Sequence, residues 1–167
     1  AWRGPRGVVC IVGECVPQDM GLDRFTDEVD IYFAETFPGY KLGACHCDPA
    51  GAVRDGIFEQ VAFDHLITKG FSVVPAPSND IAVRIDAAKA PFGRMIDGKP
   101  GILIHRRCVK LIKALSGAWH FRRLQVAGEK YSDKPDKSHP YSDVGDGFSY
   151  YCSGSGETMS TARGVDP

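Results

Sequence analysis

KLGACHCDPAGAVRDGIFEQVAFDHLITKGFSVV, residues 41–74, predicts a strand, a helix and a second strand in that order. The apolar run Lys41–Cys47 stops at Asp48-Pro49-Ala50-Gly51, which is a typical strand end. Apolar residues from Ile57 to Ile67 indicate a helix, and Lys69-Gly70 closes it with a cation and a glycine. Phe71–Val74 is the second strand. Because strands alternate with helices, this stretch favours an α/β architecture with some parallel strands.

The same alternation continues outside this stretch, and we expect one domain without internal repeats. The predicted elements are a strand over 7–16, a helix from Asp19 or Gly21 to Phe37, a helix over 81–96 capped by Ser78-Asn79-Asp80, a strand over 101–104, a basic helix over 106–115, a strand over 118–126, a polar loop over 127–138 and a helix over 140–152. Pro91 should kink the helix in which it lies.

Composition sets the class of the protein. The chain has 167 residues, 43% hydrophobic and 25% charged residues, and a net charge of -1, which are ordinary values for one globular domain. No apolar run approaches the roughly 18 residues needed to span a bilayer, and the polar segment 2–7 is unlike a signal peptide. The chain starts with Ala1 rather than Met, and we expect it to be a fragment or an excised domain that begins at the tip of a hairpin.

Basic residues gather between His105 and Lys137, where nine Lys or Arg face only three acids. This excess fits a surface that contacts a phosphate backbone, although a solvated surface explains it equally well. The six cysteines predict core thiols rather than a disulfide framework. A zinc site at Cys45-His46-Cys47 is disfavoured, because the spacing is not that of the usual zinc knuckle.

The segment 138–151, SHPYSDVGDGFSYY, predicts a helix that carries Asp143 and Asp146 one turn apart. Asp146 between two glycines is a poor choice for helix stability, so we interpret it as a functional residue. With Asp48 at a strand end, where open α/β sheets place their sites, the acids indicate metal-assisted phosphodiester chemistry. Glu14 is a further acid of lower interest.

Other roles for these residues stay open. Asp48 also fits a helix N-cap, and Asp143 also suits the positive end of a helix dipole. For His139 we favour capping of the helix over metal binding or phosphate contact.

Several short motifs occur in one order along the chain. They are Val8–Glu14, Gln18–Gly21, Phe37-Pro-Gly39, Cys47-Asp-Pro-Ala-Gly51, Pro75–Asp80 with Arg84-Ile85, Asp97–Gly101, Arg107-Cys108, Trp119–Arg123, Asp136-Lys137, Ser138-His-Pro140 and Asp146–Tyr150. Taken together, residues 7–157 resemble the C-terminal nuclease domain of the large terminase subunit of tailed bacteriophages.

This resemblance implies a metal-dependent endonuclease that cuts double-stranded phage DNA during genome packaging. It implies an RNase H-like mixed sheet flanked by helices over residues 1–153, and we expect a flexible tail over 154–167. Asp48 and Asp146 would bind Mg²⁺ or Mn²⁺ in a two-metal site, with Asp143 as an auxiliary ligand. The DNA contacts expected are Arg122, Arg123, Lys134, Lys137 and His139.

The implied partners are the terminase ATPase domain, the small subunit and the portal, in the cytoplasm of an infected bacterium and without a membrane. The chain departs from the family in a serious way, because the strand that carries the family's first catalytic aspartate is missing before Trp2. We therefore expect the sheet to lack its first core strand and the fragment to be catalytically weakened. The alternatives are a DNA-binding or assembly module without catalysis, and another RNase H-like nuclease such as a resolvase or transposase core.

Overall fold

The computed structural model describes residues 1–52, 61–125 and 128–157. In this part the chain is a mixed α/β protein with small sheets, which confirms the predicted class. The α-helices are α1 (Leu22–Thr36), α2 (Ala62–Thr68), α3 (Ile81–Gly93), α4 (Val109–Lys113) and α5 (Tyr141–Gly154). The strands are β1 (Trp2–Arg3), β2 (Val9–Ile11), β3 (Ala44–Cys47), β4 (Ser72–Pro75), β5 (Met95–Ile96), β6 (Lys99–Pro100), β7 (Ile102–Ile104), β8 (Phe121–Arg123) and β9 (Tyr131–Pro135).

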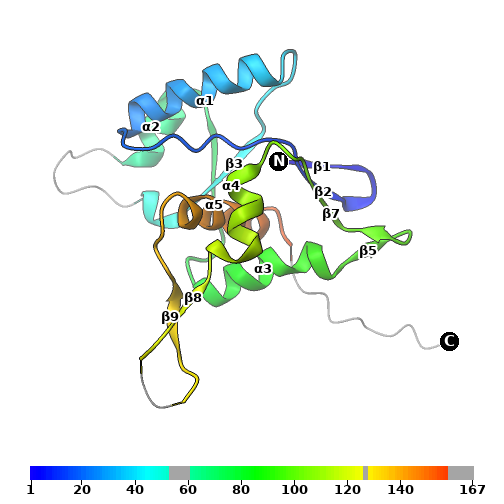
Figure 1. Cartoon of the computed structure of the whole chain (residues 1–167). Coiled ribbons are helices and arrows are strands. Elements are labelled where there is room, and N and C mark those ends of the chain that lie inside the picture. Colours follow the sequence, from blue (N-terminus) through cyan, green and yellow to red (C-terminus); the bar gives the residue numbers. More distant parts are fainter. Residues whose placement is uncertain (53–60, 126–127, 158–167) are drawn as a thin grey trace.

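The strands form four separate small sheets. One has the order β1-β2-β7, with β1 antiparallel and β7 parallel to β2. A second is the parallel pair β3-β4, which α2 connects as the sequence predicted. The other two are the hairpins β5-β6 and β8-β9, and the latter projects away from the helices (Figure 1).

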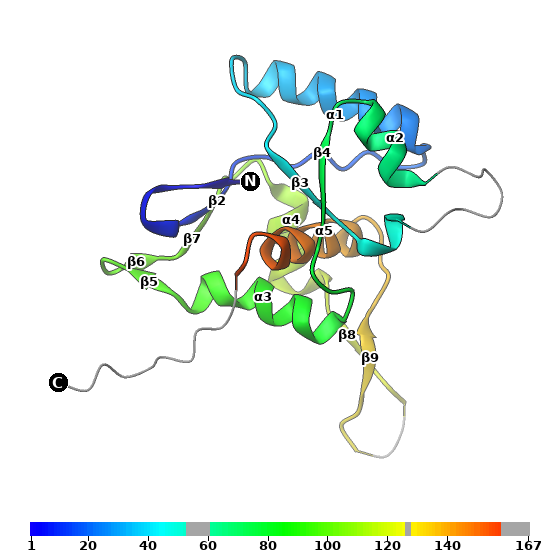
Figure 2. The same ribbon diagram turned by 180° about the vertical axis from the view of Figure 1, so that it is seen from behind.

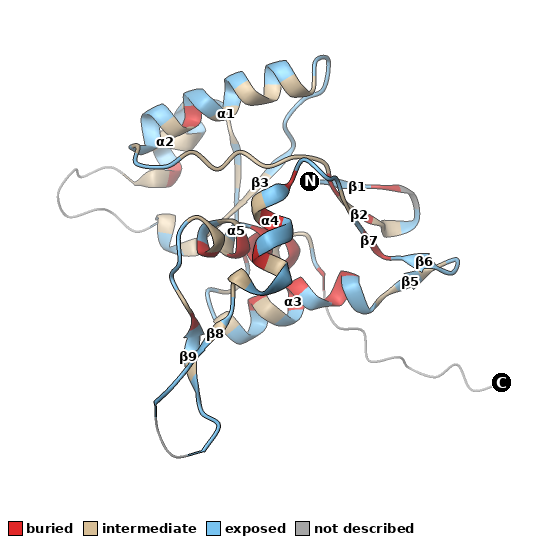
Figure 3. Ribbon diagram, in the orientation of Figure 1, coloured by how far each residue is buried: buried red, intermediate tan, exposed pale blue. Residues whose placement is uncertain are grey.

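Helix α5 lies at the centre of the molecule, with α3 on one side and β3-β4 crossing it on another (Figure 2). A cluster of buried apolar residues joins α5 to β2, β7, α3 and α4. We call these five elements the central unit. The residues of the cluster are Val9, Ile11, Ala87, Ala88, Ile102, Cys108, Leu111, Phe148 and Cys152. None of them comes from α1, β3, α2 or β4, which we call the peripheral layer; little of this layer is buried (Figure 3).

Helix α3 shows how local sequence sets one element. The Asp80 side chain accepts hydrogen bonds from the backbone N–H groups of Ala82 and Val83 and so caps the helix, as predicted. The helix ends at Gly93, two residues after Pro91, and Ile96 lies in β5. The expectation that this helix reaches Ile96 is therefore wrong, because Met95 and Ile96 pair with β6 as a strand instead.

Other elements also differ from the sequence-based expectation: β8 covers only Phe121–Arg123 of the predicted 118–126, and α4 only Val109–Lys113 of the predicted 106–115. Residues 131–135 form β9 instead of a loop, because their backbone pairs with β8 although their side chains are polar. The first predicted strand contracts to Val9–Ile11. The hairpin before it turns at Pro5–Gly7, so the chain starts in the β1 strand and not near the tip.

The predicted tail starts too early. Helix α5 runs to Gly154, and Glu157 is only 2% exposed. Its carboxylate pairs with Arg3 at 2.5 Å and with Arg94 at 2.8 Å, so residues 154–157 belong to the folded unit. Residues 158–167 of the predicted tail, and Ile57 of the predicted second helix, lie outside the described residues. Within the described ranges, no helix has the length and hydropathy needed to cross a membrane.

Candidate functional site

An open cleft of about 760 Å³ lies where β3, α3, β9 and α5 meet. Its walls carry both acids and cations. The polar lining residues are Asp48, Asn79, Asp80, Arg84, Lys134, Lys137, Asp143, Asp146 and Tyr150. The three acids predicted from the sequence therefore line one cleft, although two come from α5 and the third follows β3.

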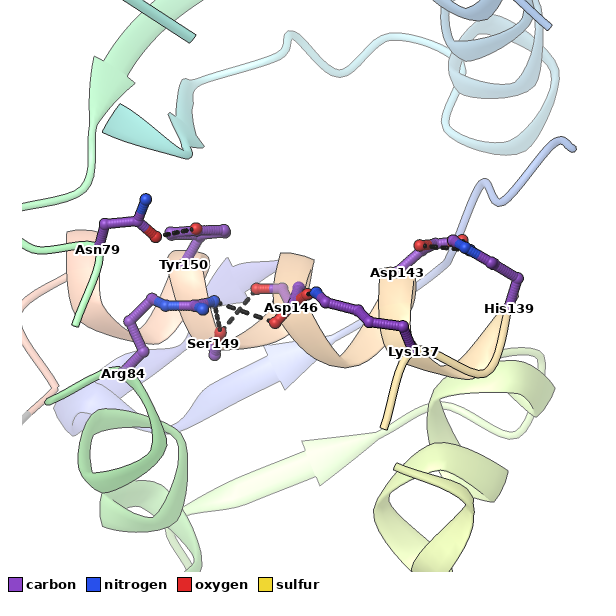
Figure 4. Close-up of polar contacts among 8 residues, drawn as sticks. All are labelled: Asn79, Arg84, Lys137, His139, Asp143, Asp146, Ser149 and Tyr150. Carbon is purple, nitrogen blue, oxygen red and sulfur yellow. Dashed lines mark hydrogen bonds and ion pairs between the residues drawn. The ribbon is translucent and has the colours of Figure 1, made fainter. Parts of the chain in front are cut away.

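Asp146 has cations on two sides (Figure 4). One carboxylate oxygen accepts a hydrogen bond from Nη1 of Arg84 at 3.1 Å, and the other accepts one from Nζ of Lys137 at 2.5 Å. The Arg84 side chain is 7% exposed, whereas that of Lys137 is 66% exposed. One oxygen of Asp146 thus satisfies a buried guanidinium, and the other is paired only with an exposed lysine.

Arg84 is the residue that organises this wall of the cleft. Its Nη1 also donates to Oγ of Ser149 at 2.9 Å, and its guanidinium lies 4.1 Å from the ring centroid of Tyr150. The Tyr150 hydroxyl donates to Oδ1 of Asn79 at 2.6 Å. Burial raises the pKa of Tyr150, and the nearby Asp48 carboxylate raises it further. Tyr150 therefore stays a hydrogen-bond donor at neutral pH.

Asp48 caps a short turn in addition to lining the cleft. Its Oδ1 accepts from the backbone N–H of Ala50 at 2.9 Å, at the start of the 3-10 turn Pro49–Ala52. This is the capping role that sequence analysis left open, although it involves a 3-10 turn and not α2. A Cβ on Gly51 would lie 2.5 Å from the Phe63 ring, so close packing explains this glycine without a ligand.

Asp143 pairs with His139 at the amino-terminal end of α5. Nδ1 of His139 lies 2.8 Å from a carboxylate oxygen of Asp143, and both side chains are largely exposed. The residue at the helix start is Pro140, without a side-chain cap. The expectation that His139 caps the helix is therefore wrong, because its ring binds the carboxylate one turn further on.

The glycines beside Asp146 have different roles. A Cβ on Gly145 would lie 2.4 Å from the Trp119 ring, so this glycine lets α5 pack closely against the segment before β8. A Cβ on Gly147 would meet nothing within 4 Å, because Gly147 faces the cleft. One of the two glycines thus has a packing reason, and the other leaves space beside the acids.

The residues predicted to bind DNA lie in three places. Lys134 and Lys137 line the cleft. Arg122 and Arg123 are exposed on β8, in the projecting hairpin, away from the cleft lining (Figure 1). His139 lies at the Asp143 end of the cleft (Figure 4). Lys134, Lys137 and His139 are thus close to the acids, whereas Arg122 and Arg123 are outside the cleft lining.

Carboxylate oxygens are the donors that Mg²⁺ and Mn²⁺ prefer, so the chemistry of Asp48, Asp143 and Asp146 suits such an ion. The Lys137 ammonium already stands beside Asp146 as a cation that a divalent ion would displace. In the described parts of the chain, no three His, Cys, Asp or Glu residues lie close enough to form a ready metal site. The acids would have to approach one another on binding.

Sequence reasoning missed the role of Arg84, Asn79, Ser149 and Tyr150. All four stand in the motifs that carry the resemblance, and Arg84 interrupts an otherwise apolar helix face. A buried charge in such a position requires a partner, which is the signal that would have identified Arg84.

Comparisons of this chain with protein-family models, curated proteins and solved structures gave no match.

Proposed function

We propose that this chain is the core of a metal-dependent DNA endonuclease with an RNase H-like fold, of the kind found in terminase large subunits. The observation that carries the proposal is the shared cleft of Asp48, Asp143 and Asp146, bordered by Lys134 and Lys137. Acids that bind divalent cations beside basic residues that bind phosphate are what phosphodiester hydrolysis requires. The proposal puts the protein in the cytoplasm of an infected bacterium.

Asp48 and Asp146 would hold Mg²⁺ or Mn²⁺, with Asp143 as an auxiliary ligand. The bound ions would activate water and stabilise the leaving oxygen. Arg84 orients the Asp146 carboxylate through its 3.1 Å contact, and Tyr150 and Ser149 hold Arg84 in place. Lys137 would then release Asp146 and become free to contact a phosphate.

The projecting β8-β9 hairpin supports binding of a long polyanion. Arg122 and Arg123 are exposed on one strand and Lys134 is exposed on the other. Contacts of this kind bind the backbone of double-stranded DNA without reading its sequence. In a larger assembly, an ATPase domain, a small subunit and a portal would deliver the DNA.

Calorimetric titration of Mn²⁺ into the chain tests the metal site. We expect binding in the wild type and at least about tenfold weaker binding in Asp48→Asn, as loss of a metal-site residue produces. Asp86→Asn is the matched control, because Asp86 is an exposed acid of α3 outside the cleft lining. Equal binding by all three proteins would refute the assignment.

Cleavage is measured separately, by relaxation of supercoiled plasmid with Mn²⁺ and with EDTA. We expect cleavage that needs metal and is lost in Asp48→Asn but retained in Asp86→Asn. Asp146→Asn is a weaker test, because this residue also satisfies the buried Arg84.

A second function, DNA binding without catalysis, is supported by the pairing of Asp146 with two cations and by the absence of a ready metal site among described residues. It predicts DNA binding without Mn²⁺ binding or cleavage. Fluorescence anisotropy with a duplex measures this. The double variant Arg122→Ala/Arg123→Ala should weaken binding and reduce its salt dependence, while Arg24→Ala, on α1, should not.

A further inference from the structure

Cys45 and Cys47 form a close thiol pair on β3. Residues two apart on a strand point to the same face, and the two Sγ atoms lie 3.7 Å apart. Both residues are half-buried, and all six cysteines of the chain are free thiols. Cys108 and Cys152, in contrast, are completely buried in the central unit, as core thiols are expected to be.

A bond between these two sulfurs depends on the geometry of the strand. Two residues of extended chain span about 6.6 Å between Cα atoms. Disulfides tolerate Cα separations up to about 6.8 Å but prefer about 5.5–6 Å. A disulfide also needs its two Cβ atoms about 3.5–4.5 Å apart, so a bond across one residue requires the backbone of β3 to leave its extended conformation between Cys45 and Cys47. The strain in such a bond makes it easy to reduce, so it suits a reversible change better than a permanent link.

The surroundings favour reaction between these two residues. His46 points to the opposite face of β3, where Gly154 and Tyr151 of α5 contact it, so it does not separate the thiols. The hydrogen bond from Cys47 lowers the pKa of Cys45 to about 7, against the effect of burial. A lowered pKa favours the thiolate of Cys45, which is the nucleophilic form.

We propose that Cys45 and Cys47 are a peroxide-sensitive dithiol that closes to a disulfide within β3. The Cys45 thiolate attacks one oxygen of hydrogen peroxide, the O–O bond breaks, and hydroxide leaves with Cys45 as a sulfenic acid. The Cys47 sulfur then attacks the Cys45 sulfur and the S–O bond breaks. The departing hydroxide takes the Cys47 proton and leaves as water. The two thiols lose two electrons, which reduce the peroxide.

Closure would alter the end of β3 where it joins the cleft. The Cys47 carbonyl accepts the hydrogen bond from the backbone N–H of Ala76 at 2.9 Å, and Asp48 is the next residue. Contraction between residues 45 and 47 moves this carbonyl relative to β4. The proposal rests on the thiol pair alone and is independent of the proposed nuclease activity.

Peptide mapping tests the proposal on the full chain. Trypsin cuts after Lys41 and Arg54, and the peptide between these sites contains Cys45 and Cys47 but no other cysteine. After peroxide treatment and alkylation, we expect this peptide to lose two hydrogens and to take up no alkylating reagent. Dithiothreitol before alkylation should restore both thiols. Two alkylated thiols after peroxide, or a disulfide with any other cysteine, would overturn the proposal.

Two variants separate the steps. In Cys47→Ser, dimedone should trap Cys45 as the sulfenic acid, because the second thiol is gone. In Cys15→Ser, a matched half-buried cysteine outside β3, the disulfide in the 42–54 peptide should form as in the wild type. Irreversible oxidation of Cys45 in the wild type without a disulfide would also contradict the pairing.

Discussion

The two cations on Asp146 should differ greatly in what they contribute to stability. Arg84 is buried, so removal of Asp146 leaves a guanidinium without its counter-charge. Breaking a buried pair costs about 3–5 kcal/mol, and the residual exposure of Asp146 places Asp146→Ala at about 3 kcal/mol. The contact with Lys137 is exposed, so Lys137→Met should cost only about 0.5 kcal/mol.

Double-mutant cycles measured by urea unfolding test this difference. The cycle of Arg84→Met with Asp146→Ala should give a coupling of about 2 kcal/mol, as contacting residues in one network do. The cycle of Lys137→Met with Asp146→Ala should give about 0.5 kcal/mol and fall with added salt. With a slope of about 2 kcal/mol/M, Asp146→Ala alone should lower the urea midpoint by about 1.5 M.

The outcome that would refute this reasoning is equal coupling in the two cycles. A coupling below about 0.5 kcal/mol for Arg84 would also refute it, because the guanidinium would then be satisfied without Asp146. The same measurement shows which Asp146 variants remain folded, which is needed before any loss of cleavage is attributed to a lost metal ligand.

Three further predictions concern other parts of the fold. Gly145→Ala should lower the free energy of unfolding by about 1–3 kcal/mol in urea titrations, because the new methyl group meets Trp119, whereas Gly147→Ala, with open space, should raise it by about 0.5–1 kcal/mol; equal effects would contradict the packing. Glu157→Ala should cost about 1–2 kcal/mol in the same assay, because it removes a buried carboxylate that pairs with two half-exposed arginines, and an unchanged midpoint would show that these pairs do not contribute. Alkylation of Cys45 by iodoacetamide should rise with pH with a midpoint of about 7, since its folded pKa is lowered, while a midpoint near that of an ordinary thiol would contradict the hydrogen bond from its neighbour.

Local signals account for the parts of the fold that sequence analysis predicted. The β3-α2-β4 unit combines an apolar strand, a turn and a glycine stop, and the Asp80 cap acts on residues next to it in the chain. Strand β9 escaped prediction because its residues are polar and only pairing with β8 makes them a strand. The pairing of strands into separate sheets depends on contacts distant in sequence, which periodicity does not encode.

In the candidate site, too, features set by neighbouring residues were predicted and features set by distant contacts were not. Asp48 and Asp146 stood out through a strand end and through an unfavourable helix position, both of which are local. Arg84 lies 62 residues from Asp146 in the chain, so only the packing of α3 against α5 reveals their contact. The metal ligands and the DNA contacts remain predictions, since they depend on molecules that must bind.

The division between the central unit and the peripheral layer has a consequence for local unfolding. Regions with little buried apolar surface open at lower free energy than the core, so amides of α1, α2 and β3 should exchange hydrogen faster than those of α5. Exposed pairs of Lys69 with Asp23 and Asp27 join α1 to α2 and add little protection. Asp48 then belongs to the part that opens first and Asp146 to the part that opens last. Asp48 can therefore move away from Asp146 and return while α5 stays folded.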